Sequence, residues 1–333
     1  MADGPNHRRP LFAAIDLGTS NCRLLMGTPA ADGFRVVDSF SRVVRLGEGL
    51  HETGRLSAAA MERALVALHG CAARLARRPI RAHRAVATEA CRRAENGAEF
   101  LRRVQAETGL NVAVITPREE ANLALESCLP LLGGARRALL FDIGGGSTEL
   151  AWVRLDGRDG PELIGYASLP SGVVTLSEQF GPDACTPAGF DAMTAHVSEQ
   201  LRAFERVHCI RHEMSLGGVR VVGTSGTVTT LAGIALNLAR YRRPLVDGTV
   251  LAAADAHAAV ATLRGLDRAG LALHPCVGPD RADLVLPGCA MFHAISTVWP
   301  AREVTVADRG LREGMLLRMM APRARRPVPS VAA

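Results

Sequence analysis

The chain has 333 residues, which is enough for about two domains of ordinary size. Apolar residues make up 48% and aromatic residues 4%, so leucine, valine and alanine must supply most of the packing. All 39 basic residues are arginine, against 33 acidic residues, for a net charge of +6. The lack of lysine excludes mechanisms that need its amine, such as a phosphate-loop lysine or a Schiff base. Any phosphate chemistry must use arginine, backbone amides, hydroxyl groups or a metal ion.

The positive charge is concentrated between Arg74 and Arg103, where nine arginines stand against three glutamates. This excess equals the net charge of the whole chain. Such a segment is typical of proteins that bind nucleic acid, a membrane surface or a polyanionic substrate, and equally of a solvated helix face. Residues 74–84 fit the solvated face. Arg92 and Arg93 follow a predicted strand, and we expect them at a cleft.

Cysteine usage and terminal composition indicate the compartment. Eight cysteines are scattered without a CxxC or CxxH pair, which argues against a zinc site and a disulfide framework. The N-terminus lacks the pattern of a signal peptide, and the uncharged run 221–239 is broken by polar residues and glycine. We therefore expect a cytoplasmic protein with no membrane contact. A disordered leader is predicted over 1–10 and a disordered tail over 322–333.

Short β-rich runs alternate with helical patterns between these ends, which predicts an α/β fold. Strands are expected at 11–15 and 22–26 around a tight turn, and again at 34–40 and 42–46. Ser57 is expected to cap a long helix. The next expected elements are a strand at 85–87, a helix near 97–107, a strand at 112–115 and a helix from 117 to about 129.

The segment after residue 133 repeats the opening plan of a strand ending in Asp, a glycine-rich turn and a second strand. We infer two related domains, one formed by 11–131 plus 308–321 and the other by 132–307. The later expected elements are helices at 187–206 and 225–238, strands at 219–222 and 303–306, mostly helix over 255–300, and a last helix at 309–320 that returns to the first domain.

Two Asp-Gly turns are candidate phosphate sites. In the first, Gly18 and Thr19 offer amides and a hydroxyl to phosphate oxygens, while Asp16 can hold a Mg²⁺ water. Taken alone, this pattern is more often an ordinary hairpin turn. In the second, the three glycines 144–146 indicate a close backbone approach, and the acids Asp142 and Glu149 suit Mg²⁺ or Mn²⁺. A hairpin bulge explains those glycines but not both acids.

A third turn, Gly223-Thr224-Ser225-Gly226, leads from a strand into the N-terminus of a helix, where free amides favour an anion. A strand-to-helix connection capped by serine or threonine is the alternative.

Two adjacent glutamates have different expected roles. Thr116 is a good N-cap, and Glu119 falls three residues later, so its carboxylate is expected to turn back to the Thr116 amide in a capping box. Glu120 has no such duty and points to another side of the helix. Near the predicted domain joint, it is the carboxylate best placed to act as a general base. A solvated helix glutamate is the alternative.

Taken together, these motifs resemble those of the exopolyphosphatase / guanosine-pentaphosphate phosphatase (Ppx/GppA) family. The matching segments, in family order from residue 13 to 316, are AAIDLGTSNCRLL, VRLGEGL, AVATEACRRAENG, REEANLAL, FDIGGGSTEL, SLPSGVVTL, VVGTSGTVTTLAG and VADRGLREGML. The resemblance implies a duplicated actin-like/Hsp70-like ATPase (ribonuclease H-like) fold with an interdomain cleft. It also implies removal of the terminal phosphate of inorganic polyphosphate or pppGpp with Mg²⁺, Mn²⁺ being an alternative.

The resemblance implies roles for particular residues. Glu120 would be the essential glutamate, and Asp142 and Glu149, with Asp16, would be the metal ligands. The implied substrate-binding residues are Gly18, Thr19, Ser20, Asn21, Arg23, Arg92, Gly144, Gly145, Gly146, Ser147, Thr148, Gly223, Thr224, Ser225 and Gly226.

Two departures from the family pattern stand out. The first turn reads Thr19-Ser20-Asn21 where the family has Ser-Asn-Ser, and the chain resembles the short members that lack a helical C-terminal region. The alternatives left open are a non-hydrolysing actin-like nucleotide-binding scaffold and, last, nucleic-acid binding through 74–103, which lacks interleaved aromatics. We expect no nucleic-acid partner, and the sequence leaves a homodimer open.

Overall fold

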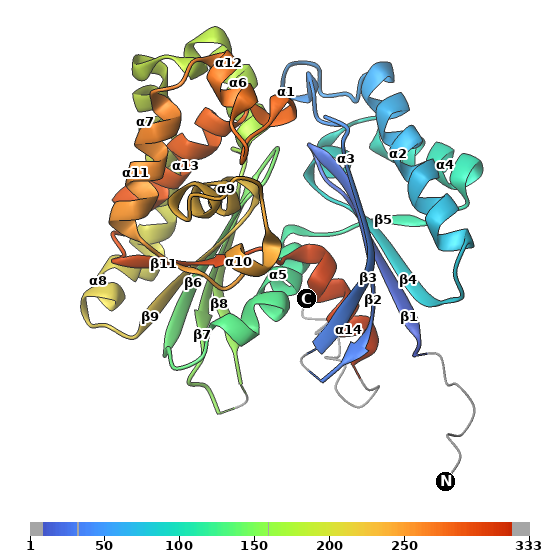
Figure 1. Cartoon of the computed structure of the whole chain (residues 1–333), viewed down its shortest axis with the longest axis horizontal. Helices are drawn as coiled ribbons and strands as arrows, with labels where there is room; N and C mark the ends of the chain where they lie inside the picture. The colour runs from blue at the N-terminus through green and yellow to red at the C-terminus, as the bar shows by residue number, and fades with distance from the viewer. Residues whose placement is uncertain (1–8, 32, 159, 322–333) are drawn as a thin grey trace.

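The computed structural model has two lobes, each built on one β-sheet with helices on both faces (Figure 1). The structure describes residues 9–31, 33–158 and 160–321. Most of the predicted leader and the whole of the predicted tail lie outside these described residues. Within them, no helix has the length and apolar character needed to cross a membrane.

The first sheet has the strand order β3-β2-β1-β4-β5. Its strands are β1 Leu11–Leu17, β2 Asn21–Ala30, β3 Gly33–Val43, β4 Ile80–Ala87 and β5 Val112–Val114. The first three form an antiparallel meander, and β4 and β5 join in parallel. The sequence predicts two strands at 34–40 and 42–46, which is wrong: β3 is one strand because it pairs with β2 along its whole length.

The second sheet repeats this topology. Its strands are β6 Arg137–Ile143, β7 Thr148–Arg154, β8 Glu162–Leu169, β9 Val219–Thr224, β10 Val250–Ala252 and β11 Glu303–Ala307. The series β8-β7-β6-β9-β11 has the same antiparallel and parallel pairings as β3-β2-β1-β4-β5, with β10 added at the edge. The two halves therefore share one plan, as the repeated Asp-Gly turn predicts.

Helices cover the outer face of each sheet. Outside the first sheet lie α2 Ala58–Ala76 and α4 Gly97–Thr108, and outside the second lie α6 Val173–Phe180, α7 Pro187–His208, α9 Gly226–Ala235, α11 Ala253–Arg264 and α13 Val285–Val298. The shorter helices are α1 Leu50–Thr53, α3 Glu89–Arg93, α8 Ile210–Ser215, α10 Arg243–Val246 and α12 Arg268–Leu273, with 3₁₀ turns at Leu129–Leu131, Gly181–Cys185 and Pro279–Arg281. The side chain of Ser57 caps α2, as predicted.

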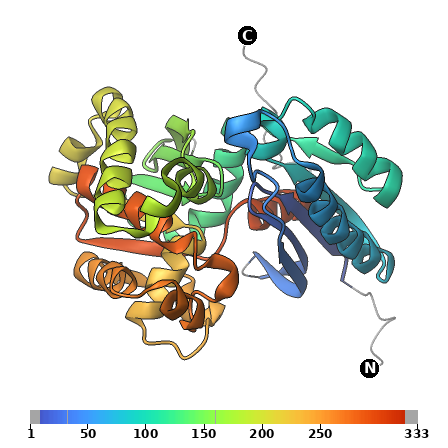
Figure 2. The same cartoon turned by 90° about the horizontal axis from the view of Figure 1, so that it is seen from above.

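Two helices lie between the sheets, α5 Pro117–Cys128 and α14 Leu311–Met320. Leu123 of α5 packs with α14 against the first sheet, while Ala121 and Leu125 pack against the second. The chain crosses between the lobes at α5 and again just before α14 (Figure 2). The final helix thus returns to the first lobe, as expected, while the exact domain bounds stay a prediction.

Strand alternation turns the polar residues of both hairpins toward this middle layer. Ala14 and Leu140 belong to the inner hydrophobic clusters, so Asp16 and Asp142, two residues further along, face the same side. The space between the lobes is therefore where the predicted site residues of the two hairpins meet.

Candidate active site

The two Asp-Gly turns have the same backbone geometry. The Gly18 amide donates to the Asn21 carbonyl at 2.9 Å, and the Gly144 amide donates to the Ser147 carbonyl at 2.9 Å. Each turn follows an acid on the inner face of its sheet. The residues opposite those acids differ, because Asp16 pairs with Arg23 and Asp142 with Glu149.

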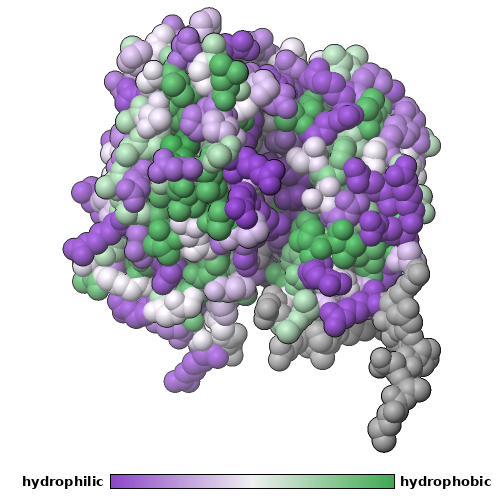
Figure 3. Space-filling view, in the orientation of Figure 1, coloured by the Kyte–Doolittle hydropathy of each residue, from purple (hydrophilic) through white to green (hydrophobic). Residues whose placement is uncertain are grey.

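A cavity of about 930 Å³ lies between the lobes. Hydrophilic residues gather at this hollow in the space-filling view (Figure 3). Most of the predicted site residues line it, namely Asp16, Gly18, Thr19, Ser20, Asn21, Arg23, Glu120, Asp142, Gly144, Gly145, Gly146, Ser147, Glu149, Thr224, Ser225 and Gly226. Arg92, Thr148 and Gly223 are not among the described lining residues.

The structure shows which contacts these three residues make instead. The hydroxyl of Thr148 is buried and donates to the Ser171 carbonyl at 2.8 Å. A Cβ on Gly223 would lie 2.5 Å from the ring of Phe141, so this glycine permits close strand packing. Arg92 lies behind Glu120 and contacts it.

The glycines of the second turn permit contact between the two hairpins. A Cβ on Gly145 would lie 3.0 Å from the Ser20 amide nitrogen, and a Cβ on Gly146 would lie 2.2 Å from Glu89 Oε2 and 2.8 Å from Thr19 Oγ1. None of the three glycines has a positive φ. Gly145 and Gly146 are therefore required because a side chain there would collide with the first turn or with Glu89, whereas a side chain on Gly144 would collide with the Ser147 carbonyl of its own turn.

Four of the acids that line the cavity, Asp16, Glu120, Asp142 and Glu149, come from the predicted site and have raised pKa values. Burial is the largest cause; it raises the pKa of Asp142 to about 6 and that of Glu149 to about 7. Burial also raises the pKa of Asp16. The pKa of Glu120 lies well above its ordinary value, first because of burial and then because of the charge of Glu149. The raised pKa values therefore reflect mainly burial, which disfavours the charged form of each acid.

The structure separates the roles of the two adjacent glutamates. The Thr116 hydroxyl accepts from the Glu119 amide at 3.2 Å, as an N-cap should. The expected return contact from the Glu119 carboxylate is wrong, because that group accepts from Arg84 at 2.5 Å. A tertiary ion pair replaces the capping box. Glu120 points into the cavity, and its buried Oε2 has no hydrogen-bond partner among the described residues.

Arg92 is the cation nearest to that atom. Its Nη1 lies 3.5 Å from Glu120 Oε2 and donates to the Ile115 carbonyl at 2.9 Å. The charge of Arg92 lowers the pKa of Glu120, against the raising effects of burial and of the other acids. Arg93 instead pairs with Glu89 at 2.9 Å, and Glu89 accepts from Thr19 of the first turn at 3.2 Å.

The third turn combines a cap with backbone strain. The Ser225 hydroxyl accepts from the Val228 amide at 3.2 Å, so Ser225 is the N-cap of α9. Its φ of 140° is rare for a residue with a side chain. The helix therefore begins at the cavity, with Gly226 and Thr227 among the lining residues.

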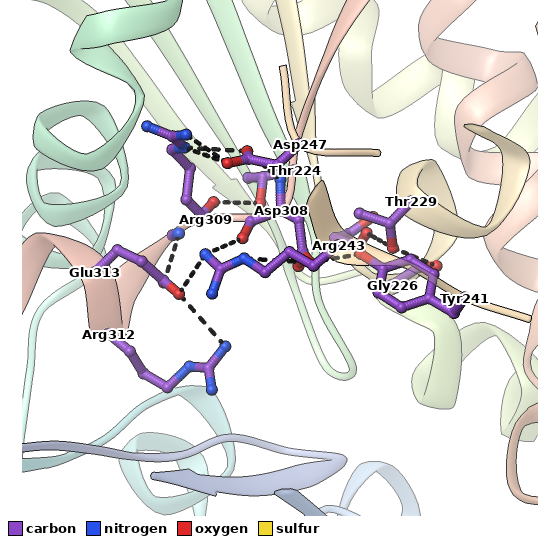
Figure 4. Close-up of polar contacts among 12 residues, drawn as sticks. Thr224, Gly226, Thr229, Tyr241, Arg243, Asp247, Asp308, Arg309, Arg312 and Glu313 are labelled. Atoms are coloured by element: carbon purple, nitrogen blue, oxygen red, sulfur yellow. Dashed lines mark hydrogen bonds and ion pairs between the residues drawn. The ribbon is translucent and has the colours of Figure 1, made fainter. Parts of the chain in front are cut away.

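Sequence reasoning missed several cavity residues. Arg281 and Arg312 line the cavity, and burial lowers the pKa of both. Figure 4 shows a further network at the start of α14, where Tyr241 donates to Asp308 at 2.5 Å and Arg243 donates to Glu313 at 3.1 Å. Arg312 and Glu313 stand in the family-like segment VADRGLREGML, which was the available signal. Arg281 ends the 3₁₀ turn Pro279–Arg281 in the connection between α12 and α13, where no local pattern marks it.

The predicted metal ligands Asp16, Asp142 and Glu149 fit Mg²⁺ by chemistry. Among the residues that the structure describes, no three His, Cys, Asp or Glu side chains come close enough to hold an ion by themselves. Mg²⁺ usually takes only one or two carboxylates and completes its shell with water and substrate phosphate oxygens. Buried acids with raised pKa values are also the groups that a divalent cation would stabilise.

Comparison with solved structures supports one fold over the whole described chain. A Ppx/GppA family member from Aquifex aeolicus is 29% identical with a TM-score of 0.76, and the match covers 93% of this chain and 97% of that one. An exopolyphosphatase-like protein is 30% identical with a TM-score of 0.80, over 94% of this chain and 99% of that one. An exopolyphosphatase from Cytophaga hutchinsonii, 23% identical, has a TM-score of 0.83 over 93% and 97% and shows the same fold. The predicted fold class is confirmed.

The sequence model of the Ppx/GppA phosphatase family matches residues 28–322. That span includes the second and third glycine-containing turns, Glu120 and the start of α14, although the first turn precedes it. The family resemblance inferred from the motifs is confirmed by this match. The chain belongs to the Ppx/GppA phosphatase family.

Proposed function

We propose that this phosphatase hydrolyses the terminal phosphoanhydride of inorganic polyphosphate and releases orthophosphate. The observation that carries the proposal is the buried Glu120 Oε2, which has no hydrogen-bond partner among the described residues and belongs to a cavity lined by glycine-rich turns and arginines. A carboxylate whose pKa is raised is a stronger base than an ordinary carboxylate and is therefore better suited to take a proton from water. A non-hydrolysing nucleotide-binding scaffold would have no need of such a group.

In this proposal the terminal phosphoryl group lies between the two hairpin turns. Glu120 takes a proton from a water molecule, whose oxygen attacks the terminal phosphorus. The bond from phosphorus to the bridging oxygen breaks, and the electron pair leaves with the shortened chain. Backbone amides of the turns, with Arg23 and Arg281, stabilise the negative oxygens, as expected for phosphoryl transfer.

Asp142 and Glu149, with Asp16, would hold Mg²⁺, with Mn²⁺ as the alternative. When bound, the ion neutralises charge on the phosphate oxygens. Ser147 and Ser168 donate to Glu149 Oε1 at 2.6 and 3.0 Å, so one oxygen of this acid is fixed in place before any ion binds. The eight free cysteines, six of them buried, support the further proposal that the protein works in the reducing cytoplasm.

A second candidate substrate is pppGpp. The observation that favours it is Tyr241, the one aromatic side chain among the described lining residues, which is 36% exposed. An aromatic ring can stack on a nucleobase, whereas inorganic polyphosphate offers nothing to stack. Phosphate release from the two substrates at equal concentration decides between them. If pppGpp is the substrate, Tyr241→Ala should lower its turnover and leave that of polyphosphate unchanged.

The decisive experiment compares two adjacent glutamates. Glu120→Gln should lower phosphate release from polyphosphate by about 100-fold or more, the usual contribution of a general base. Glu119→Gln is the matched control, since this residue is on the same helix but pairs with Arg84 outside the cavity. Its turnover should stay close to that of the wild type. Equal losses in the two variants, or none in Glu120→Gln, would contradict the proposal. ATP binding without hydrolysis of any linear phosphate would favour the scaffold.

A further inference from the structure

Arg312 is a cavity-lining arginine that no described side chain fully engages. It stands in the first turn of α14, and its side chain is 16% exposed. Its guanidinium makes no hydrogen bond to another described residue. The nearest carboxylate oxygen, Glu313 Oε1, lies 3.7 Å from Nη2, which is beyond hydrogen-bond length. A guanidinium has five N–H donors, and those of Arg312, which lines the cavity, are free of described hydrogen-bond partners and can bind an anion that enters it.

Both carboxylate oxygens of Glu313 accept hydrogen bonds from other groups, and neither accepts one from Arg312. Oε2 accepts from the Gly310 amide at 2.9 Å, and Oε1 accepts from Arg243 at 3.1 Å. Arg243 in turn donates to the Asp308 carbonyl at 2.6 Å. In Figure 4 the guanidinium of Arg312 lies at the end of this network, joined to it only by the long contact with Glu313.

The surroundings of Arg312 include further positive charge. Burial lowers the pKa of Arg312, and so does the charge of Arg23, while Asp16 and Glu313 raise it. Arg23 also lowers the pKa of Arg281, after burial. Three arginines from β2, from the loop before α13 and from α14 therefore line one cavity. Asp16 and Glu313 offset part of this positive charge, and an anion bound among the three arginines would be stabilised by all of them.

We propose that Arg312 binds a phosphoryl group of the substrate and, with Arg23, completes an anion site on the inner face of the first sheet. The proposal rests on the proposed function for the identity of the anion, a linear phosphate. The planar guanidinium donates two parallel hydrogen bonds to the nonbridging oxygens of one phosphoryl group and keeps its charge at any working pH. It takes no part in proton transfer.

The test measures binding in a background that does not turn over. Calorimetric titration of the Glu120→Gln protein with sodium tripolyphosphate gives the reference Kd. Adding Arg312→Gln should raise that Kd by roughly 10- to 100-fold, the usual effect of losing a charged hydrogen-bonding partner. Adding Arg312→Lys, which keeps the positive charge but cannot donate two parallel hydrogen bonds, should give an intermediate Kd. Arg302→Gln removes an exposed arginine outside the cavity and should change the Kd by less than about two-fold.

Each outcome of these titrations either supports or overturns the proposed role of Arg312. An unchanged Kd in the Arg312→Gln protein, with its thermal midpoint also unchanged, overturns the proposal. If that variant unfolds early, the Kd of the Arg312→Lys protein decides instead, and a value equal to the reference overturns the proposal. If the wild type releases no phosphate from any linear phosphate, the proposed function fails, while the binding comparison still decides the role of Arg312.

Discussion

Asp142 and Glu149 lie directly opposite each other in the antiparallel β6–β7 pair. The equivalent position in the β1–β2 pair joins Asp16 to Arg23. Like charges opposed across a sheet are destabilising, whereas opposite charges are favourable. The first hairpin therefore has an internal counter-ion for its acid, and the second hairpin has two acids and no internal counter-ion. We expect this arrangement where a cation and a phosphate bind together, because the second hairpin can attract the cation and Arg23 of the first can attract the phosphate.

This opposition predicts how stability depends on pH. The pKa of Asp142 is raised from 3.8 to about 6, and that of Glu149 from 4.5 to about 7. Because the folded chain holds protons that the unfolded chain has already released, these groups destabilise the fold increasingly as pH rises from about 4 to 7. We expect Asp142→Asn to change the free energy of unfolding in the stabilising direction by roughly 1–2 kcal/mol more at pH 8 than at pH 5 when no divalent cation is present.

Urea unfolding of both proteins at pH 5 and pH 8, with a chelator present, measures this difference. Mg²⁺ should reduce the gain at pH 8, because the ion stabilises the wild-type carboxylates and not the amide. An effect of the same size at both pH values would show that Asp142 does not titrate in this range.

The two hairpins show which parts of the fold and of the site can be predicted from the sequence. The β-rich apolar runs and the repeated Asp-Gly turn place Asp16 and Asp142 correctly at two related strand ends, because local pairing determines both. β8 was not predicted: its residues are mostly half-exposed, it contains a glycine, and it forms by pairing with β7. Its alternation is therefore weak.

Long-range contacts account for the rest. The Thr116 cap is local and is predicted correctly, whereas the Glu119 carboxylate is drawn away by Arg84, 35 positions earlier in the chain. Arg281 and Arg312 reach the cavity only because separate elements converge there. No spacing within either segment marks them as partners of Arg23.

The close approach of the two turns makes a second prediction. Gly146→Ala would place a methyl group 2.2 Å from Glu89 Oε2, and Glu89 is held by Arg93 and Thr19. We expect a loss of about 1–3 kcal/mol in the free energy of unfolding, as for other overpacked sites, with a parallel loss of phosphate release. Gly133→Ala is the matched control, since a Cβ on Gly133 would meet nothing within 4 Å beyond its chain neighbours and its φ is not positive.

Urea unfolding and a phosphate assay on both variants give the answer. The Gly133→Ala protein should stay within about 0.5 kcal/mol of the wild type. Equal stability in the two variants would mean that the turns do not need their close contact.

A third prediction concerns Arg92, whose substitution should lower kcat and leave KM nearly unchanged. Because it contacts Glu120 and is absent from the described cavity lining, Arg92→Gln should lower kcat by about 10- to 100-fold. The KM for polyphosphate should change by less than about two-fold. Arg23→Gln, which removes a lining residue, should raise KM instead. Steady-state kinetics on both variants test this, and a raised KM with unchanged kcat for Arg92→Gln would place Arg92 on the substrate.

The fourth prediction concerns a polar contact between the two lobes. Arg45 donates to Asp283 through both terminal nitrogens, at 2.8 and 3.0 Å, and thereby joins the loop after β3 to the second lobe. Its own amide donates to the Ser20 carbonyl at 2.9 Å, and its φ is 45°, an uncommon conformation for arginine. One residue thus links the first turn to the opposite lobe.

Loss of either member of the Arg45–Asp283 pair should loosen the first turn. Arg45→Ala and Asp283→Ala should therefore each weaken tripolyphosphate binding by roughly three- to ten-fold. The double variant should bind no worse than either single variant. This non-additivity follows because each single change already breaks the link. Glu62→Ala, which breaks an exposed pair with Arg103 remote from the cavity, should leave the affinity unchanged. Titration of the four variants in the Glu120→Gln background measures the coupling. Strictly additive losses would mean that Arg45 and Asp283 act on the substrate independently rather than through the position of Ser20.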